Sequence, residues 1–138
     1  MSISNIFGIS GSAMAAENIR LNVTASNLAN AQNVGSDEQT TYRAREPVFS
    51  TLMNPEMGDE EQVAGVRVDR IAERQGELLK EYNPGHPLAD AEGFITNTNV
   101  NTVEEMSNLI AASRAYQNNV EVMKTAKDLM MKTLELGQ

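Results

Sequence analysis

Residues 102–136, TVEEMSNLIAASRAYQNNVEVMKTAKDLMMKTLEL, are 35 consecutive positions without glycine or proline, and they decide the fold. Large side chains recur along this run at heptad spacing. One set stands at seven-residue intervals and a second set lies three before or four after it: Leu109, Tyr116, Met123 and Met130, with Met106, Val120 and Leu134. This spacing predicts one helix, about 50 Å long, with an apolar seam for a partner helix.

The composition of this run also indicates where the helix begins and how many neighbours it has. Thr102 is placed to cap the first turn, with Glu105 three residues later to complete a capping box. A thinner apolar stripe of Val103, Ile110 and Met131 runs beside the seam. Two stripes on one helix predict contacts with more than one neighbour.

The N-terminal segment, residues 5–32, predicts a second helix. Its large residues Phe7, Met14, Leu21 and Leu28 are spaced seven apart. Four asparagines in the same segment lower its intrinsic helix propensity: Asn18, Asn22, Asn27 and Asn30. We therefore expect this helix to fold mainly against a partner.

The middle of the chain predicts short strands. Residues 42–49 alternate partly, although Pro47 restricts them to an edge or irregular strand. Val66 and Val68 indicate a second strand, and residues 78–82 a third. Residues 54–62, with Pro55, Gly58 and three successive acids, predict a solvated turn between two extended pieces.

Together these segments predict a mainly α protein with a small β unit, an α+β fold. The long N- and C-terminal helices form a coiled-coil-like hairpin, with an irregular antiparallel β insertion between them. The predicted divisions are an N-terminal axial helix over 1–32, a middle unit over 33–99 and a C-terminal axial helix over 100–138, the two helices forming one structural domain.

Composition excludes several classes of partner. The formal charge is −8, and residues 33–99 carry 13 acids and 6 bases. Such a surface repels nucleic acid and anionic lipid, so we do not expect nucleic-acid binding. No apolar run approaches about 18 residues, so we do not expect membrane insertion either. The chain has no cysteine, and its N-terminus lacks the pattern of a cleaved signal peptide.

No group of residues predicts a catalytic, cofactor or metal site, or a small-molecule substrate. His86 is the only histidine and stands between Gly85 and Pro87, so an ordinary loop residue is expected there. Five arginines lie among acids in the predicted strands, which favours ion pairs over a basic binding strip: Arg43, Arg45, Arg67, Arg70 and Arg74, with Glu46, Asp69, Glu73 and Glu77.

Three stretches resemble signatures of a known family. These are RLNVTASNLANA at 20–31, YNPGHPLADAEGF at 82–94 and SRAYQNNVEV at 113–122. They are similar to segments of the bacterial flagellar rod and hook proteins, and the central stretch resembles the proximal-rod members in particular. The resemblance covers almost the whole chain.

This resemblance implies a structural subunit of the basal-body proximal rod that assembles with copies of itself and with other rod proteins and transmits torque. It implies export without a cleaved signal through the flagellar type III apparatus to the periplasm, with terminal segments that become helices on assembly. The alternative from periodicity alone is a soluble helical-hairpin adaptor or chaperone that binds another protein's helix. An enzyme is disfavoured.

Overall fold

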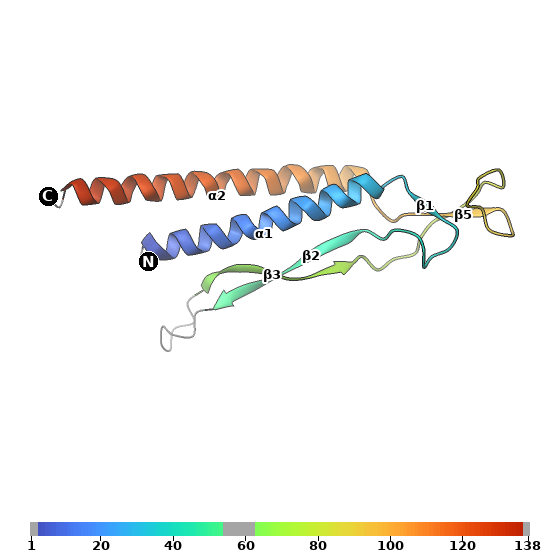
Figure 1. The fold of residues 1–138 in the computed structure, drawn as a ribbon, viewed down its shortest axis with the longest axis horizontal. Coiled ribbons are helices and arrows are strands. Elements are labelled where there is room, and N and C mark those ends of the chain that lie inside the picture. The colour runs from blue at the N-terminus through green and yellow to red at the C-terminus, as the bar shows by residue number, and fades with distance from the viewer. Residues whose placement is uncertain (1–2, 54–62, 137–138) are drawn as a thin grey trace.

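The computed structural model describes residues 3–53 and 63–136, and its two long helices run side by side (Figure 1). Helix α1 spans Ile3–Asn30 and helix α2 spans Thr102–Leu136. Both chain ends lie at the same end of an elongated molecule, and α2 extends beyond the start of α1. The turn predicted at 54–62 lies outside the described residues.

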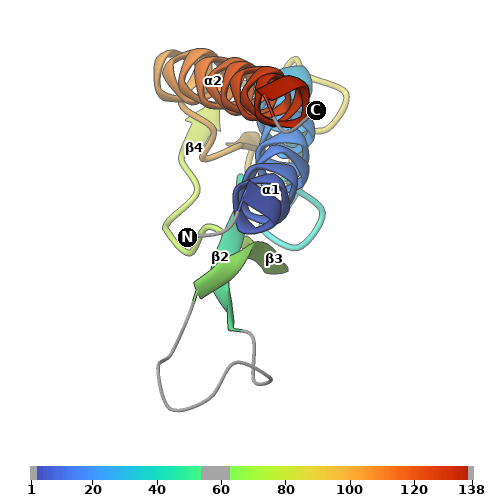
Figure 2. The same cartoon turned by 90° about the vertical axis from the view of Figure 1, so that its left-hand side faces the viewer.

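Helix α1 is the central layer of the molecule. Figures 1 and 2 show α2 on one side of it and the β2–β3 hairpin on the other. Because α1 is covered on two sides, its buried positions carry small or polar side chains that allow close approach: Ser10, Ala16, Val23, Thr24 and Asn27. The low helix propensity of this segment is therefore offset by packing on both faces.

The N-cap of helix α2 stands one residue before the predicted one. The side-chain oxygen of Asn101 accepts hydrogen bonds from the backbone N–H groups of Val103, at 3.1 Å, and Glu104, at 3.3 Å. Asn101 is therefore the N-cap, and the prediction that Thr102 caps the helix is wrong. Glu105 is buried beside Arg74.

A long antiparallel hairpin lies against α1. Strand β2 spans Arg45–Met53 and pairs with β3, Val63–Glu73, with Pro47 opposite Ile71. The register shifts just after Pro47, between Val48 and Phe49. Proline cannot donate a ladder hydrogen bond, so it fits this two-stranded, irregular setting. The predicted edge strand is confirmed, but it begins at Arg45 instead of residue 42 and continues to Met53 instead of ending at residue 49.

A second small sheet forms the end of the molecule opposite the chain termini. Its order is β1-β5-β4, with β1 at Val34–Gly35, β4 at Lys80–Tyr82 and β5 at Phe94–Asn97. Tyr82 and Phe94 are cross-strand neighbours whose rings meet edge to face at 5.2 Å. Gly93 precedes β5 with a φ of +86°, a conformation that favours glycine.

The buried apolar side chains of the described residues are few and mostly small. They are Ala16, Val23, Ala44, Leu78, Ile95, Ala112 and Ala126. The predicted fold class is confirmed: paired terminal helices with small antiparallel sheets between them, an α+β arrangement. The core contains few large side chains because the helices and strands pack along narrow faces and do not surround one common centre.

Candidate assembly interface

Helix α2 meets α1 through large residues alternating with small ones. Leu109, Tyr116 and Met123 are half-buried, while Ala112 and Ala126 are fully buried. The Met123 side chain reaches Gly11 of α1, where a Cβ atom would lie 3.8 Å from the Met123 Cε, an ordinary van der Waals distance. Small residues at these positions let the two helix backbones come close together.

The predicted α1 residues Phe7, Met14, Leu21 and Leu28 are all half-buried. Two buried polar residues, Ser10 and Thr24, follow three positions after Phe7 and Leu21. A polar link supplements the helix pair, since Arg20 Nη2 donates to Asn108 Oδ1 at 3.3 Å. Sequence reasoning missed the small residues of both helices, because alanine, serine and threonine give no strong apolar signal.

The other predicted α2 residues face solvent. Met106 is 57% exposed, Val120 is 44% exposed and Leu134 is 63% exposed. We call six of the large apolar residues that are exposed on α2 the outer stripe: Val103, Met106, Ile110, Val120, Met131 and Leu134. Met130 continues the α1-facing line but is also exposed. Helix α2 therefore carries a covered face and an uncovered apolar face.

The hairpin is anchored to α1 by one amide side chain. Asn27 Nδ2 donates to the Arg45 carbonyl at 2.9 Å, and its Oδ1 accepts from the Arg45 N–H at 2.9 Å. The Tyr42 hydroxyl donates to the same Oδ1 at 2.9 Å. Asn27 thus pairs with the start of β2 as a neighbouring strand would.

The hairpin is also tied to α2 through one guanidinium. Arg74 donates to both Glu104 oxygens, at 3.0 and 3.1 Å, and to Glu46 of β2. The hydrogen bond that Arg74 donates to Glu46 raises the pKa of Arg74 above its usual value. Its side chain is only 26% exposed, so this bidentate pair is better shielded from solvent than an isolated surface ion pair.

The predicted pairing of the strand arginines with acids is confirmed for the group as a whole. Besides Arg74, the pairs are Arg43 with Glu38, Arg45 with Glu73, and Arg67 and Arg70 with Asp69. Most of these groups are exposed, so each pair contributes little to stability alone.

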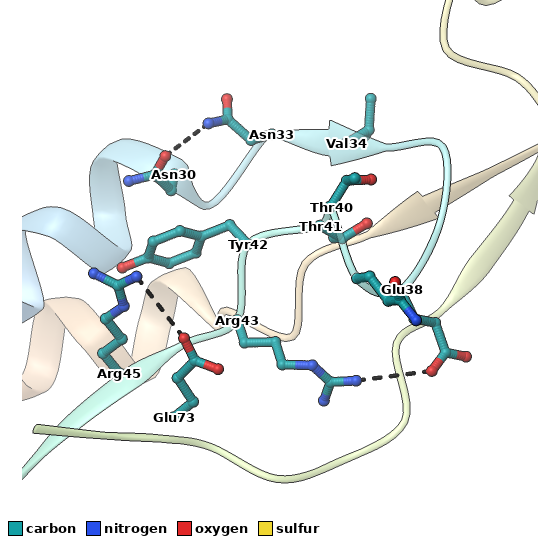
Figure 3. A pocket seen from close by; sticks show the side chains of 11 residues that line it. Asn30, Asn33, Val34, Glu38, Thr40, Thr41, Tyr42, Arg43, Arg45 and Glu73 are labelled. Atoms are coloured by element: carbon teal, nitrogen blue, oxygen red, sulfur yellow. Dashed lines mark hydrogen bonds and ion pairs between the residues drawn. The ribbon is translucent and has the colours of Figure 1, made fainter.

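Figure 3 shows a polar recess just beyond the end of α1. The Arg43 and Arg45 guanidinium groups in its wall each approach a carboxylate to 3.8 Å, that of Glu38 and that of Glu73. The Arg45 guanidinium also lies 5.4 Å from the centre of the Tyr42 ring. These groups bind one another, which makes the recess a structural joint between α1, β1 and β2.

The described residues hold no group of three or more His, Cys, Asp or Glu side chains that could bind a metal ion. His86 Nδ1 accepts a hydrogen bond from the Leu88 N–H at 3.1 Å, a contact within its own loop. Neither of the two described helices is long and apolar enough to cross a membrane.

Comparison with known proteins identifies the family. Residues 7–35 match the model described as flagella basal body rod protein, and residues 91–136 match the model of the flagellar basal body rod FlgEFG protein C-terminal region. These two segments contain most of α1 and all of α2 within the described residues.

Full-length relatives give the same result. The chain is 47% identical to the flagellar basal-body rod protein FlgC of Salmonella typhimurium and 49% identical to that of Yersinia enterocolitica, with 100% of each chain covered. Identity to the corresponding Buchnera aphidicola protein is 42%, again over both full lengths. The chain therefore belongs to the flagellar basal-body rod protein FlgC family and is a structural subunit of the rod, not an enzyme.

Proposed function

We propose that this rod subunit is built into the proximal rod, beside copies of itself and other rod proteins, through its two terminal helices. The residues proposed to carry helix and subunit contacts are Phe7, Met14, Leu21, Leu28, Met106, Leu109, Tyr116, Val120, Met123, Met130 and Leu134. The half-buried residues of this set hold α1 and α2 together, and the exposed residues contact neighbouring subunits.

The observation that carries this proposal is the outer stripe of α2. It holds six large apolar side chains on one helix, and each is exposed in the single chain. An apolar stripe of this length is unusual on a protein that works alone, and it suits a helix that is covered on assembly. Burying one such side chain contributes about 1.5–3 kcal/mol.

Torque transmission follows from rigid connections between layers. The Asn27 amide fixes the hairpin to α1, and the Arg74 guanidinium fixes it to the start of α2. A force applied to the helices is then passed to the hairpin through short, directional contacts. This role needs no bond to be made or broken.

We further propose that the chain reaches the periplasm unfolded, through the flagellar type III apparatus and without a cleaved signal. The lean core supports this route, because the buried apolar side chains of the described residues are mostly alanines. A core of this kind costs little to unfold before passage through a narrow channel. The absence of cysteine removes any risk of a disulfide forming on the way.

The test places a charge on the outer stripe. Ile110→Asp introduces a carboxylate at an exposed apolar position, so the free energy of unfolding should change by no more than about 0.5 kcal/mol. Rod incorporation should nevertheless be lost, because an unpaired charge would be buried between subunits. The measurements are urea unfolding of the purified chain, and motility and basal-body composition in cells whose own copy is deleted.

Ala111→Asp is the matched control, since Ala111 is also exposed on α2 but lies one position away from the stripe. It should support normal motility. Normal rods containing the Ile110→Asp chain would overturn the proposal. So would equal loss of assembly in both variants, because the effect would then be one of charge anywhere on the helix.

A further inference from the structure

The methionines of this chain fall into two groups that differ in exposure. Within the described residues, Met14 of α1 and Met123 of α2 are half-buried, and the Met123 side chain reaches Gly11 of α1. The other described methionines are exposed: Met53 on β2, and Met106, Met130 and Met131 on α2. The fold therefore shields one group of thioether sulfurs and leaves the other group open to solvent.

Two of the exposed methionines belong to the outer stripe and lie on the same side of α2. Met106 and Met131 are 25 positions apart. At 3.6 residues per turn this separation is within roughly 20° of seven whole turns, and it spans about 37 Å along the helix axis. The exposed Val120 lies between them, close to the same line. A surface that covers this side of α2 along its length therefore covers both sulfur atoms.

The thioether gives this side of α2 a chemistry that valine, leucine and isoleucine lack. Peroxide oxidises methionine to its sulfoxide. One oxygen atom passes from hydrogen peroxide to the sulfur, the sulfur loses two electrons, and the peroxide is reduced to water. The product carries a polar S–O group, which is costly to bury without a hydrogen-bond donor. The chain has no cysteine, so no thiol of its own competes for the oxidant.

We propose that Met106 and Met131 are oxidation sites, and that their conversion to sulfoxide by peroxide keeps the subunit out of the rod. This inference rests on the proposed function, because the sulfoxide is harmful only if the outer stripe is covered on assembly. Once the stripe is covered, peroxide no longer reaches the two sulfurs. The subunit is therefore sensitive to oxidation before it is assembled and resistant afterwards.

The first experiment measures the oxidation rate of each methionine by mass spectrometry after treatment with hydrogen peroxide. In the purified chain, Met106 and Met131 should oxidise faster than the half-buried Met123. Their rates should be close to that of Met53, since the exposed fractions are 57%, 51% and 54%. In isolated basal bodies, the rates at Met106 and Met131 should fall about tenfold. Unchanged rates at both residues would overturn the proposal.

The second experiment imitates the sulfoxide with a polar side chain of similar length. Met106→Gln combined with Met131→Gln should lower rod incorporation about tenfold, because two amide groups would be buried without partners. The purified double variant should unfold at the same urea concentration as the unmodified chain, since both positions are exposed. Normal incorporation of this variant would overturn the proposal.

Two controls isolate the cause of that loss. Met53→Gln makes the same change at an equally exposed position outside the outer stripe, and it should leave incorporation normal. Met106→Leu combined with Met131→Leu keeps the stripe apolar and cannot form a sulfoxide, so it should also assemble normally. Equal loss in the leucine variant would overturn the proposal, because the effect would then not come from polarity.

The two proposals fail in different ways. If Ile110→Asp stops rod incorporation and the glutamine double variant does not, the oxidation proposal is wrong and the assembly role of the outer stripe stands. If neither change affects incorporation, the stripe is not covered in the rod, and both the oxidation proposal and the proposed function are wrong.

Discussion

Asn27 joins the first long helix to the hairpin with a single amide. It is almost completely buried, and its two polar atoms are satisfied by Arg45 and Tyr42. A buried polar group costs little only while all its partners are present. The asparagines that lower the helix propensity of this segment therefore include one that holds the fold together.

The first prediction concerns this residue. Asn27→Ala removes the side-chain partner of the Arg45 backbone groups and one of the two hydrogen bonds of the Tyr42 hydroxyl, which keeps Ser26, so the free energy of unfolding should fall by about 1–3 kcal/mol. Urea unfolding followed by circular dichroism measures the change. Asn22→Ala is the control: Asn22 is exposed on the same helix, and its side chain donates a hydrogen bond to Asn18, four residues earlier.

The control substitution should change the free energy of unfolding in the opposite direction. Alanine has the higher helix propensity, so Asn22→Ala should raise the free energy of unfolding by a few tenths of a kcal/mol, roughly. Equal and small effects at positions 22 and 27 would show that the hairpin is held by something other than the Asn27 amide.

At the scale of elements, the β2–β3 hairpin touches α1 where one glycine allows it. Gly65 of β3 has a φ of +150°, and a Cβ atom there would lie 2.2 Å from the Ser12 Oγ. Ser12 Oγ meanwhile accepts a hydrogen bond from the Val66 N–H at 3.1 Å and donates to the Ile9 carbonyl at 2.8 Å. The strand backbone therefore lies directly on the helix at this point.

The second prediction compares two glycines. Gly65→Ala should destabilise the fold by about 1–3 kcal/mol, because the new methyl group displaces Ser12 and the backbone is strained. Gly8→Ala should stabilise it by about 0.5–1 kcal/mol, because Gly8 is within α1 and nothing lies within 4 Å of its Cβ position. Hydrogen exchange should show faster opening of β2 and β3 only in Gly65→Ala; unchanged exchange there would contradict the close packing.

The same scale shows what the sequence could predict. Both helices and the hairpin were foreseeable, because heptad spacing and alternation are direct consequences of helix and strand geometry. The two-residue β1 and the pairing of β5 were not, since so short a strand has no period of its own. The two apolar stripes of α2 also did not indicate which of them contacts α1. The buried α2 residues at that contact, Ala112 and Ala126, have small side chains that give no strong apolar pattern.

At the scale of the whole molecule, a thin three-layer arrangement leaves much of α2 without an intramolecular partner. Residues 105–126 lie along α1, whereas residues 127–136 are all exposed in the single chain. A helix end without tertiary contacts opens readily, because short isolated helices are marginal in water. The resemblance to rod proteins implies terminal segments that order on assembly, and this geometry limits that change to specific parts of the helices.

The third prediction follows from that geometry. In the purified chain, backbone amides of residues 127–136 should exchange with solvent rapidly, while those of residues 16–27 in α1, covered on two sides, should be protected. In isolated basal bodies, the protection of residues 127–136 should rise to the level of residues 16–27, because neighbouring subunits now cover them. Residues 16–27 provide the internal control, since their protection should change little. Two results would contradict this prediction: slow exchange of residues 127–136 already in the purified chain, or continued rapid exchange after assembly. Either would mean that neighbouring subunits do not cover this part of α2 when the rod forms.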